Sequence, residues 1–142
     1  MILLDAYAVV AFLGGEPALP QVRELLKRGD ACVTSVNLTE ALDVTDRVHG
    51  IPIAETRGVL SALEPHLSVL PVTEREAWRA ADLRARHYHR SRLAVSVADC
   101  VLVATARADD EIATADRGVL QVARSENISV VPLLDSRGRQ PE

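Results

Sequence analysis

The sequence predicts an α/β fold in which a central parallel sheet lies between two layers of helices. Short aliphatic runs alternate with longer amphipathic segments along the chain, a pattern typical of parallel strands joined by helical crossovers. The chain has 142 residues, enough for one domain with a hydrophobic core. Aromatic residues make up only 3%, so aliphatic side chains must fill that core.

Glycine, proline and capping residues divide the chain into its predicted elements. Strands are predicted over residues 2–4, 31–34, 67–72, 111–113 and 128–133. Helices are predicted over residues 6–13, 17–28, 36–49, 52–63, 73–88, 96–108 and 117–125. Residues 1–134 are predicted to form the domain, and the polar tail over residues 135–142 is expected to fray.

Charge and composition restrict the possible partners. The net charge of −4 gives no general attraction to nucleic acid, so a polyanion must be held by a local basic patch or through a metal. Asp5 interrupts the apolar N-terminal stretch, which has no basic start, and this argues against a signal peptide. No apolar run reaches membrane-spanning length, and we expect a cytoplasmic protein with no membrane partner. Cys32 and Cys100 lie in apolar runs and are expected to be buried thiols.

Four carboxylates lie where apolar segments give way to helical ones. They are Asp5, Glu40, Asp99 and Asp116. In an open α/β sheet, the carboxyl ends of the strands and the N-termini of the following helices share one edge, where ligands bind. Four acids at that edge would repel one another unless a divalent cation joined them, and ligation by oxygen alone suits Mg²⁺ or Mn²⁺. The pattern therefore predicts a metal-dependent phosphoryl-transfer site.

Each acid taken alone has a simpler interpretation as a helix cap, because carboxylates accept hydrogen bonds from the free amides at helix N-termini. Asn37 and Glu40 have the spacing of a capping box, and so do Ser96 and Asp99. The four positions together favour the metal site, because all of them follow the same predicted sheet edge. Asp5 also lies in hydrophobic sequence, where an unpaired charge is costly.

The same positions resemble the PIN-domain ribonucleases, and in particular the VapC-type toxins of bacterial toxin–antitoxin pairs. The matching segments are residues 2–5, 35–40, 96–106 and 114–116, and their order and spacing cover essentially the whole chain. The resemblance implies a PIN-like three-layer sandwich with Mg²⁺- or Mn²⁺-dependent endoribonuclease activity on RNA. It also implies a homodimer that a small cognate antitoxin neutralises.

The resemblance assigns roles to individual residues. Asp5 and Asp99 would be the principal metal ligands. Glu40 would complete the ligand shell or hold a metal-bound water, and Asp116 would finish the acidic pocket. Thr114 matches the family's hydroxyl residue before the last acid and would bind a carboxylate or the substrate.

One segment departs from the family, and another adds positive charge. Ala6-Tyr7 stands where members often have Thr or Ser followed by Asn or Ser, so a supporting hydroxyl is absent unless Tyr7 or a water replaces it.

The basic stretch 84–92 precedes the helix of Asp99. Either Arg84 and Arg86 grip RNA phosphates at the rim of the site, or the stretch is a solvated helix end.

Two other functions fit parts of the pattern. A non-catalytic PIN-like module would use the acids as caps, or as a docking pocket for a basic partner or RNA, and Ala6 mildly favours it. An aspartyl-phosphate enzyme needs an acid pair near the first strand and a well-placed lysine. Asp5 stands alone there, and Lys27 is the only lysine. Failure of Mn²⁺ to bind would favour the module over the nuclease.

Overall fold

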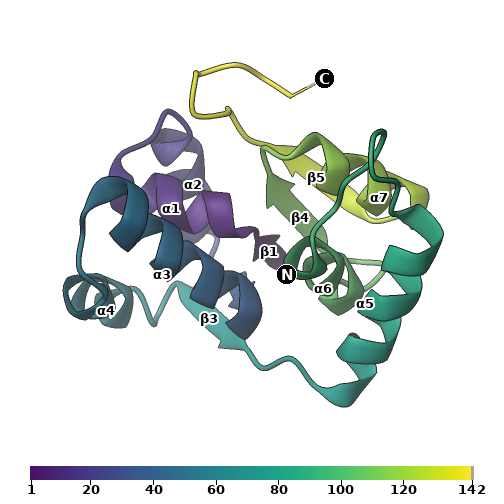
Figure 1. The fold of residues 1–142 in the computed structure, drawn as a ribbon. Coiled ribbons are helices and arrows are strands. Elements are labelled where there is room, and N and C mark those ends of the chain that lie inside the picture. The colour runs from purple at the N-terminus through teal and green to yellow at the C-terminus, as the bar shows by residue number, and fades with distance from the viewer. Residues whose placement is uncertain (142) are drawn as a thin grey trace.

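The structure, a computed structural model, describes residues 1–141, and these contain five strands and seven helices (Figure 1). The strands are β1 (Ile2–Leu4), β2 (Ala31–Thr34), β3 (Leu67–Leu70), β4 (Glu111–Thr114) and β5 (Ser129–Pro132). The helices are α1 (Ala6–Gly14), α2 (Leu19–Lys27), α3 (Ser35–His49), α4 (Ile53–Ala62), α5 (Glu74–His87), α6 (Val97–Thr105) and α7 (Arg117–Ser125).

The strands form one parallel sheet in the order β3-β2-β1-β4-β5. The chain builds outward from β1 through β2 and β3, and then continues on the other side of β1 with β4 and β5. The topological switch point therefore lies at the carboxyl end of β1, between β2 and β4. Open α/β sheets bind their ligands at such a point, and Asp5 is the residue that follows β1 there.

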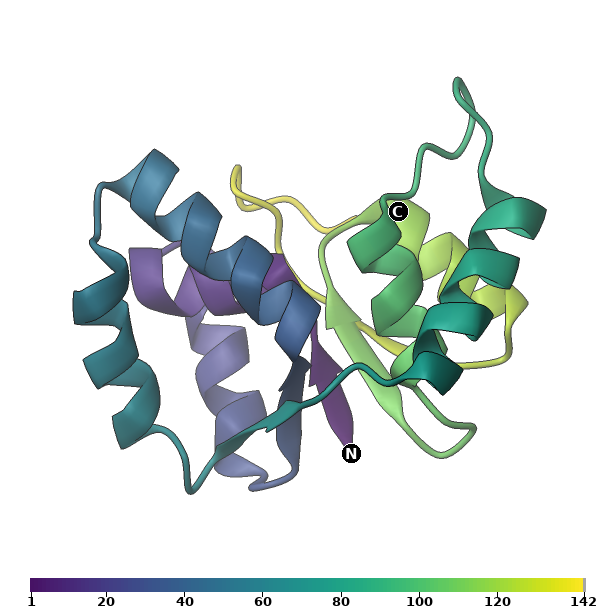
Figure 2. The same cartoon turned by 60° about the horizontal axis from the view of Figure 1, so that its bottom comes forward.

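Side chains of the sheet point alternately into two hydrophobic cores, as the two-residue period of a strand requires. Leu3 and Ile112 face the core that α5, α6 and α7 cover. Ile2, Leu4 and Ala113 face the opposite core, which α1, α2, α3 and α4 close. Figure 2 shows these two groups of helices on either side of the sheet. The predicted three-layer α/β fold is confirmed.

Every predicted strand and helix is present, and the bounds shift by a few residues for identifiable reasons. The predicted strand 67–72 ends at Leu70, because Pro71 has no N–H to donate to a neighbouring strand. The third helix begins at Ser35, one residue before the prediction, because the side chain of Thr34 caps it.

The polar tail folds into a turn. Asp135 accepts hydrogen bonds from the N–H groups of Arg137 and Arg139, both at 2.9 Å, and its carboxylate lies 2.8 Å from the Arg139 guanidinium. The N–H of Leu134 donates to the side chain of Gln21 at 2.8 Å, which attaches the start of the tail to α2. The expected fraying of the tail stays a prediction, and residue 142 lies outside the described part of the chain.

Two further expectations concern the interior and the surface. Cys32 and Cys100 are buried free thiols, as predicted. Burial raises the pKa of Cys32 to about 11, so this thiol is poorly reactive at neutral pH. Within residues 1–141, no helix has both the length and the apolar character needed to cross a membrane.

Candidate active site

Asp5 is the most buried of the four acids, with 5% of its surface exposed. Its own N–H donates to the carbonyl of Ala113 in β4 at 3.1 Å, which continues the sheet pairing one residue past β1. One carboxylate oxygen caps α1 by accepting the N–H of Ala8 at 2.8 Å, and the other accepts the hydroxyl of Thr114. The side chain is therefore held in one orientation at the switch point.

The surroundings of Asp5 disfavour its charged form. Desolvation raises its pKa to about 7 from the ordinary 3.8, although the hydrogen bonds from Thr114 and Ala8 oppose this rise. The negative charges of Asp99 and Asp116 also contribute to this raised pKa. The three carboxylates are thus close enough to repel one another.

Thr114 connects two of the acids. It is the last residue of β4 and is fully buried. Its hydroxyl donates to Asp5 and accepts the N–H of Asp116 at 3.0 Å. Because one hydroxyl serves both partners, the ends of β1 and β4 and the start of α7 are fixed relative to one another.

Asp99 and Asp116 approach the same region from the starts of α6 and α7. Asp99 forms a capping box with Ser96: its Oδ2 accepts the Ser96 N–H at 2.6 Å, and its N–H donates to the Ser96 hydroxyl at 3.0 Å. Partial burial raises the pKa of Asp99, and the charge of Asp116 adds to this rise. Asp116 is more exposed, and its Oδ1 accepts the N–H of Val119 at 2.9 Å.

The capping and metal-binding interpretations of these acids are compatible. A carboxylate has two oxygens and about four acceptor positions, and a cap uses only one of them. Within residues 1–141, Oδ1 of Asp99 and Oδ2 of Asp116 accept no hydrogen bond. The caps therefore orient these side chains and leave an oxygen of each for another ligand.

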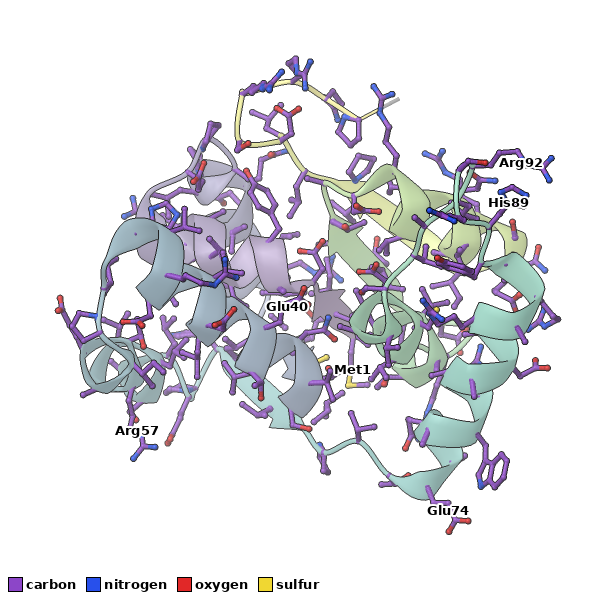
Figure 3. The ribbon with its side chains drawn as sticks, in the orientation of Figure 1. Met1, Glu40, Arg57, Glu74, His89 and Arg92 are labelled. Carbon is purple, nitrogen blue, oxygen red and sulfur yellow. The ribbon has the colours of Figure 1, made fainter. Side chains whose placement is uncertain are left out.

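Glu40 does not cap a helix, so the predicted capping box of Asn37 and Glu40 is wrong. Because α3 begins at Ser35, Glu40 lies in its second turn, and its carboxylate is free of hydrogen bonds among the described residues. Burial and the charge of Asp99, and then that of Asp43, raise its pKa. Figure 3 shows Glu40 near the centre of the molecule, between α3 and the strands β1 and β4.

A buried amide, which sequence reasoning did not identify, joins the helices of Glu40 and Asp99. Asn37 is 1% exposed. It accepts the hydroxyl of Thr34 at 2.5 Å and donates its own N–H to Thr34 Oγ1 at 3.0 Å. Its side-chain N–H₂ donates to the carbonyl of Ala98 at 3.5 Å, which links the start of α3 to the first turn of α6. The spacing of Thr34 and Asn37 is the signal that identifies this cap.

We expect replacement of Asn37 by leucine, which has a similar volume, to lower the free energy of unfolding by about 2 kcal/mol. The reason is that the buried Thr34 hydroxyl and the Ala98 carbonyl would lose their partner. Urea denaturation measures the change. Thr39→Ala is the matched control on the same helix, because Thr39 is exposed and its loss should cost less than about 0.5 kcal/mol. An Asn37→Leu variant as stable as this control would contradict the linking role.

The four acids suit a hard divalent cation in their chemistry. All the donors are carboxylate oxygens, which Mg²⁺ and Mn²⁺ prefer. Among residues 1–141, no lysine, arginine or histidine forms an ion pair with any of the four. In the described part of the chain, however, no three His, Cys, Asp or Glu side chains converge closely enough to enclose a metal ion without moving. An ion that recruits all four acids therefore requires side-chain adjustment.

Tyr7 does not supply the hydroxyl that is absent after Asp5. Its buried hydroxyl has no hydrogen-bond partner among the described residues. Desolvation raises its pKa to about 12, with smaller effects from the charges of Glu16, Asp135 and Asp5. The hydroxyl that Asp5 accepts comes from Thr114, at the end of a different strand.

The predicted RNA contacts Arg84 and Arg86 have partners within the protein. The Arg86 guanidinium lies 2.9 Å from Asp82 and 2.8 Å from Glu126, at the end of α7. Arg84 stacks on the ring of Tyr88, with 4.3 Å between the guanidinium carbon and the ring centroid.

Asp43 lies one turn beyond Glu40 on α3. Its carboxylate is paired with Arg47 at 2.7 Å on the helix surface.

The fold and the site define a three-layer α/β domain with carboxylates gathered at its topological switch point. The chain belongs to the PIN domain family, which its sequence matches over residues 2–137. Members of this family are typically nucleases and commonly bind divalent metals. The family expected from the sequence motifs is therefore confirmed. A search of curated proteins gives no match.

Solved structures with similar folds come from toxin–antitoxin systems. VapBC2 from Rickettsia felis, bound to a DNA fragment from its promoter, aligns with a TM-score of 0.67 and 14% identity over 94% of this chain and 99% of that chain. FitAcB from Neisseria gonorrhoeae aligns with a TM-score of 0.62 and 25% identity over 92% and 96%. A toxin–antitoxin complex from Klebsiella pneumoniae aligns with a TM-score of 0.60 and 15% identity over 82% and 87%.

Proposed function

We propose that this protein is a metal-dependent endoribonuclease that acts as the toxin of a toxin–antitoxin pair. The observation that carries the proposal is the buried carboxylate of Asp5, which repels Asp99 and Asp116 and has no cationic partner among residues 1–141. Burying such a group is costly unless a positive charge balances it. Mg²⁺ or Mn²⁺ would provide that charge.

The side chains have distinct roles in the proposed reaction. Asp5 and Asp99 would hold the cation, and Asp116 would complete the acidic pocket. When bound, the cation supplies electrostatic stabilisation of the charge that develops on a phosphoryl oxygen. Glu40 is exposed, the charge of Asp99 reaches it, and it has no competing hydrogen bond among the described residues. Its carboxylate would take the proton of the water that attacks phosphorus.

The proposed partners are an RNA substrate, a second copy of the chain and a cognate antitoxin, and the proposed location is the cytoplasm. Toxin–antitoxin assemblies are described for the similar structures, and this supports the antitoxin. The chain also offers an apolar groove of about 230 Å³ between α3 and α4, lined by Leu38, Leu42, Ile53 and Leu60. An amphipathic segment of an antitoxin would bury its apolar side chains in such a groove.

The test is cleavage of total cellular RNA by the purified protein, free of antitoxin, with Mg²⁺ or Mn²⁺ and with EDTA. We expect cleavage only with metal, and a loss of roughly 1,000-fold in Asp99→Asn, because one ligand of the cation is weakened. Asp43→Asn is the matched control, since Asp43 is exposed and pairs with Arg47. Cleavage that survives EDTA, or equal activity of both variants, would contradict the proposal.

A second candidate is a non-catalytic module that uses the acidic pocket to bind a basic protein or RNA. The observation in its favour is that three of the acids cap helices and that no three acids enclose an ion as they stand in residues 1–141. Titration of the purified protein with Mn²⁺ separates the two functions. The nuclease requires binding that Asp99→Asn weakens, whereas the module predicts no binding.

A further inference from the structure

A second hollow lies beside the acidic site, between α7 and the connection from α5 to α6. Its volume is about 630 Å³, and Asp116 forms part of its wall. Three arginines also line it: Arg92 from the connection, and Arg117 and Arg124 from α7. We call this hollow the arginine groove. Because Asp116 belongs to both, the groove is continuous with the acidic site.

The arginines of the arginine groove form no ion pair with any residue that the structure describes. Five arginines of the described chain form ion pairs, as Arg86 does with Glu126 at 2.8 Å. Among residues 1–141, by contrast, Arg92, Arg117 and Arg124 form no ion pair. Among the residues that the structure describes, Asp116 is the only acid in the wall, so positive charge predominates there.

The side of α7 that lines the groove is regular and polar. Arg117, Gln121 and Arg124 follow one another at intervals of four and three residues, so they share one face of the helix. The two arginines stand about 10 Å apart along the axis. The opposite face of α7 is buried in the core, which fixes the orientation of the polar face.

The opposite wall of the groove is held against α7 by close packing. The connection closes on itself through a short bridge, in which the N–H of His89 donates to the carbonyl of Leu93 at 2.9 Å. Val95 then packs over Gly118, where an added Cβ would lie 3.1 Å from Val95 Cγ1 and 3.0 Å from Asp116 Oδ1. Glycine therefore permits this close approach, which brings Arg92 to the side of α7.

We propose that the arginine groove binds a backbone phosphate of the RNA strand next to the phosphate that is cleaved. This inference rests on the proposed function and adds the element that positions the strand. Guanidinium groups bind phosphate oxygens through pairs of parallel hydrogen bonds, whereas the neighbouring carboxylates need a cation to approach a phosphate. The groove therefore attracts the strand that the acidic site alone would repel. Because these contacts involve the RNA backbone, binding at the groove should not depend on base sequence.

The test is binding of a fluorescent single-stranded RNA of about twelve nucleotides in EDTA, which prevents metal-dependent cleavage, across roughly 50–200 mM KCl. We expect the double variant Arg92→Ala/Arg124→Ala to bind about 10-fold more weakly than the wild type. The slope of log affinity against log salt should also fall by about 0.7, since the contact with one phosphate is lost. The charge-matched control is Arg23→Ala/Arg57→Ala, which removes two exposed arginines from α2 and α4. Figure 3 shows Arg57 and Arg92 on opposite sides of the molecule.

The outcomes separate this inference from the proposed function. Equal affinities of the two double variants, or no RNA binding by the wild type, would overturn the arginine groove. If the groove variant binds RNA more weakly and the control variant does not, the arginine groove is supported. If the wild type nevertheless cleaves no RNA with metal, only the nuclease proposal fails. Cleavage by the wild type with no effect of the groove variant on binding or cleavage would leave the nuclease proposal standing and refute the groove.

Discussion

Changing Asp5 to asparagine is expected to stabilise the metal-free domain at about pH 8 and to slow metal-dependent RNA cleavage roughly 1,000-fold. The side chain is 5% exposed, and burial raises its pKa to about 7 from 3.8. Each pKa unit corresponds to about 1.4 kcal/mol, so holding this carboxylate ionised costs the folded state roughly 4 kcal/mol. Asparagine removes the charge but cannot accept the Thr114 hydroxyl and the Ala8 N–H equally well. We therefore expect a net gain of about 2 kcal/mol.

The stabilisation by Asp5→Asn should depend on pH. Between 3.8 and about 7 the folded protein holds a proton on Asp5 that the unfolded chain has lost. The contribution of protonated Asp5 to stability is therefore fully present below 3.8 and is lost as the pH rises through about 7. Urea denaturation in EDTA at about pH 5 and about pH 8 measures both states. A gain of equal size at the two pH values, or a loss at the higher pH, would contradict the burial of an uncompensated charge.

Metal should reverse the order of stability. At an Mn²⁺ concentration about 100 times its Kd, the wild type gains roughly 2.7 kcal/mol, because the ion binds only the folded state. Asp5→Asn should gain much less and should cleave RNA roughly 1,000-fold more slowly. A purely structural cap would give neither effect, since asparagine also caps helices well. The exposed Asp43→Asn is again the control, with a response to Mn²⁺ like that of the wild type.

The fold could be predicted from the sequence because its signals are local. The strand at residues 2–4 is fully buried, and the glycine that ends α1 and the Ser96 that begins α6 act on their immediate neighbours. The parallel sheet follows from the alternation of strands and helices. The strand order does not follow from this alternation, because β1 is paired with β4 across more than a hundred residues.

The acids could be located from the sequence, but their surroundings could not. The capping box assigned to Asn37 and Glu40 placed the cap three residues after Thr34, which is the residue that caps the helix. The buried bond between Asn37 and Thr34 was therefore not predicted. Arg86 and Glu126 are 40 positions apart, so their pairing depends on how α5 packs near the end of α7. For the same reason, the basic stretch 84–92 contributes only Arg92 to the arginine groove, whose other arginines belong to α7.

Thr114→Val is expected to weaken the site more than any other change that leaves all four acids in place. Valine keeps the shape of the side chain and removes the hydroxyl, so Asp5 loses a donor and the Asp116 N–H loses the acceptor that lies 3.0 Å away. Because Thr114 is fully buried, water cannot replace either partner without a rearrangement. We expect the free energy of unfolding in EDTA at about pH 8 to fall by roughly 3 kcal/mol.

The effect of Thr114→Val on cleavage should be smaller than that of removing an acid, at about 10- to 100-fold, because the hydroxyl orients Asp5 without being proposed as a metal ligand. Thr114→Ser keeps the hydroxyl and should recover most of both losses. At about pH 5, where Asp5 is protonated, the loss of stability should shrink, because the hydroxyl donates most strongly to the ionised carboxylate. If valine and serine gave equal stability and equal cleavage rates, the Thr114 hydroxyl would have no part in holding Asp5, and the rigid connection between β1, β4 and α7 would have to come from packing alone.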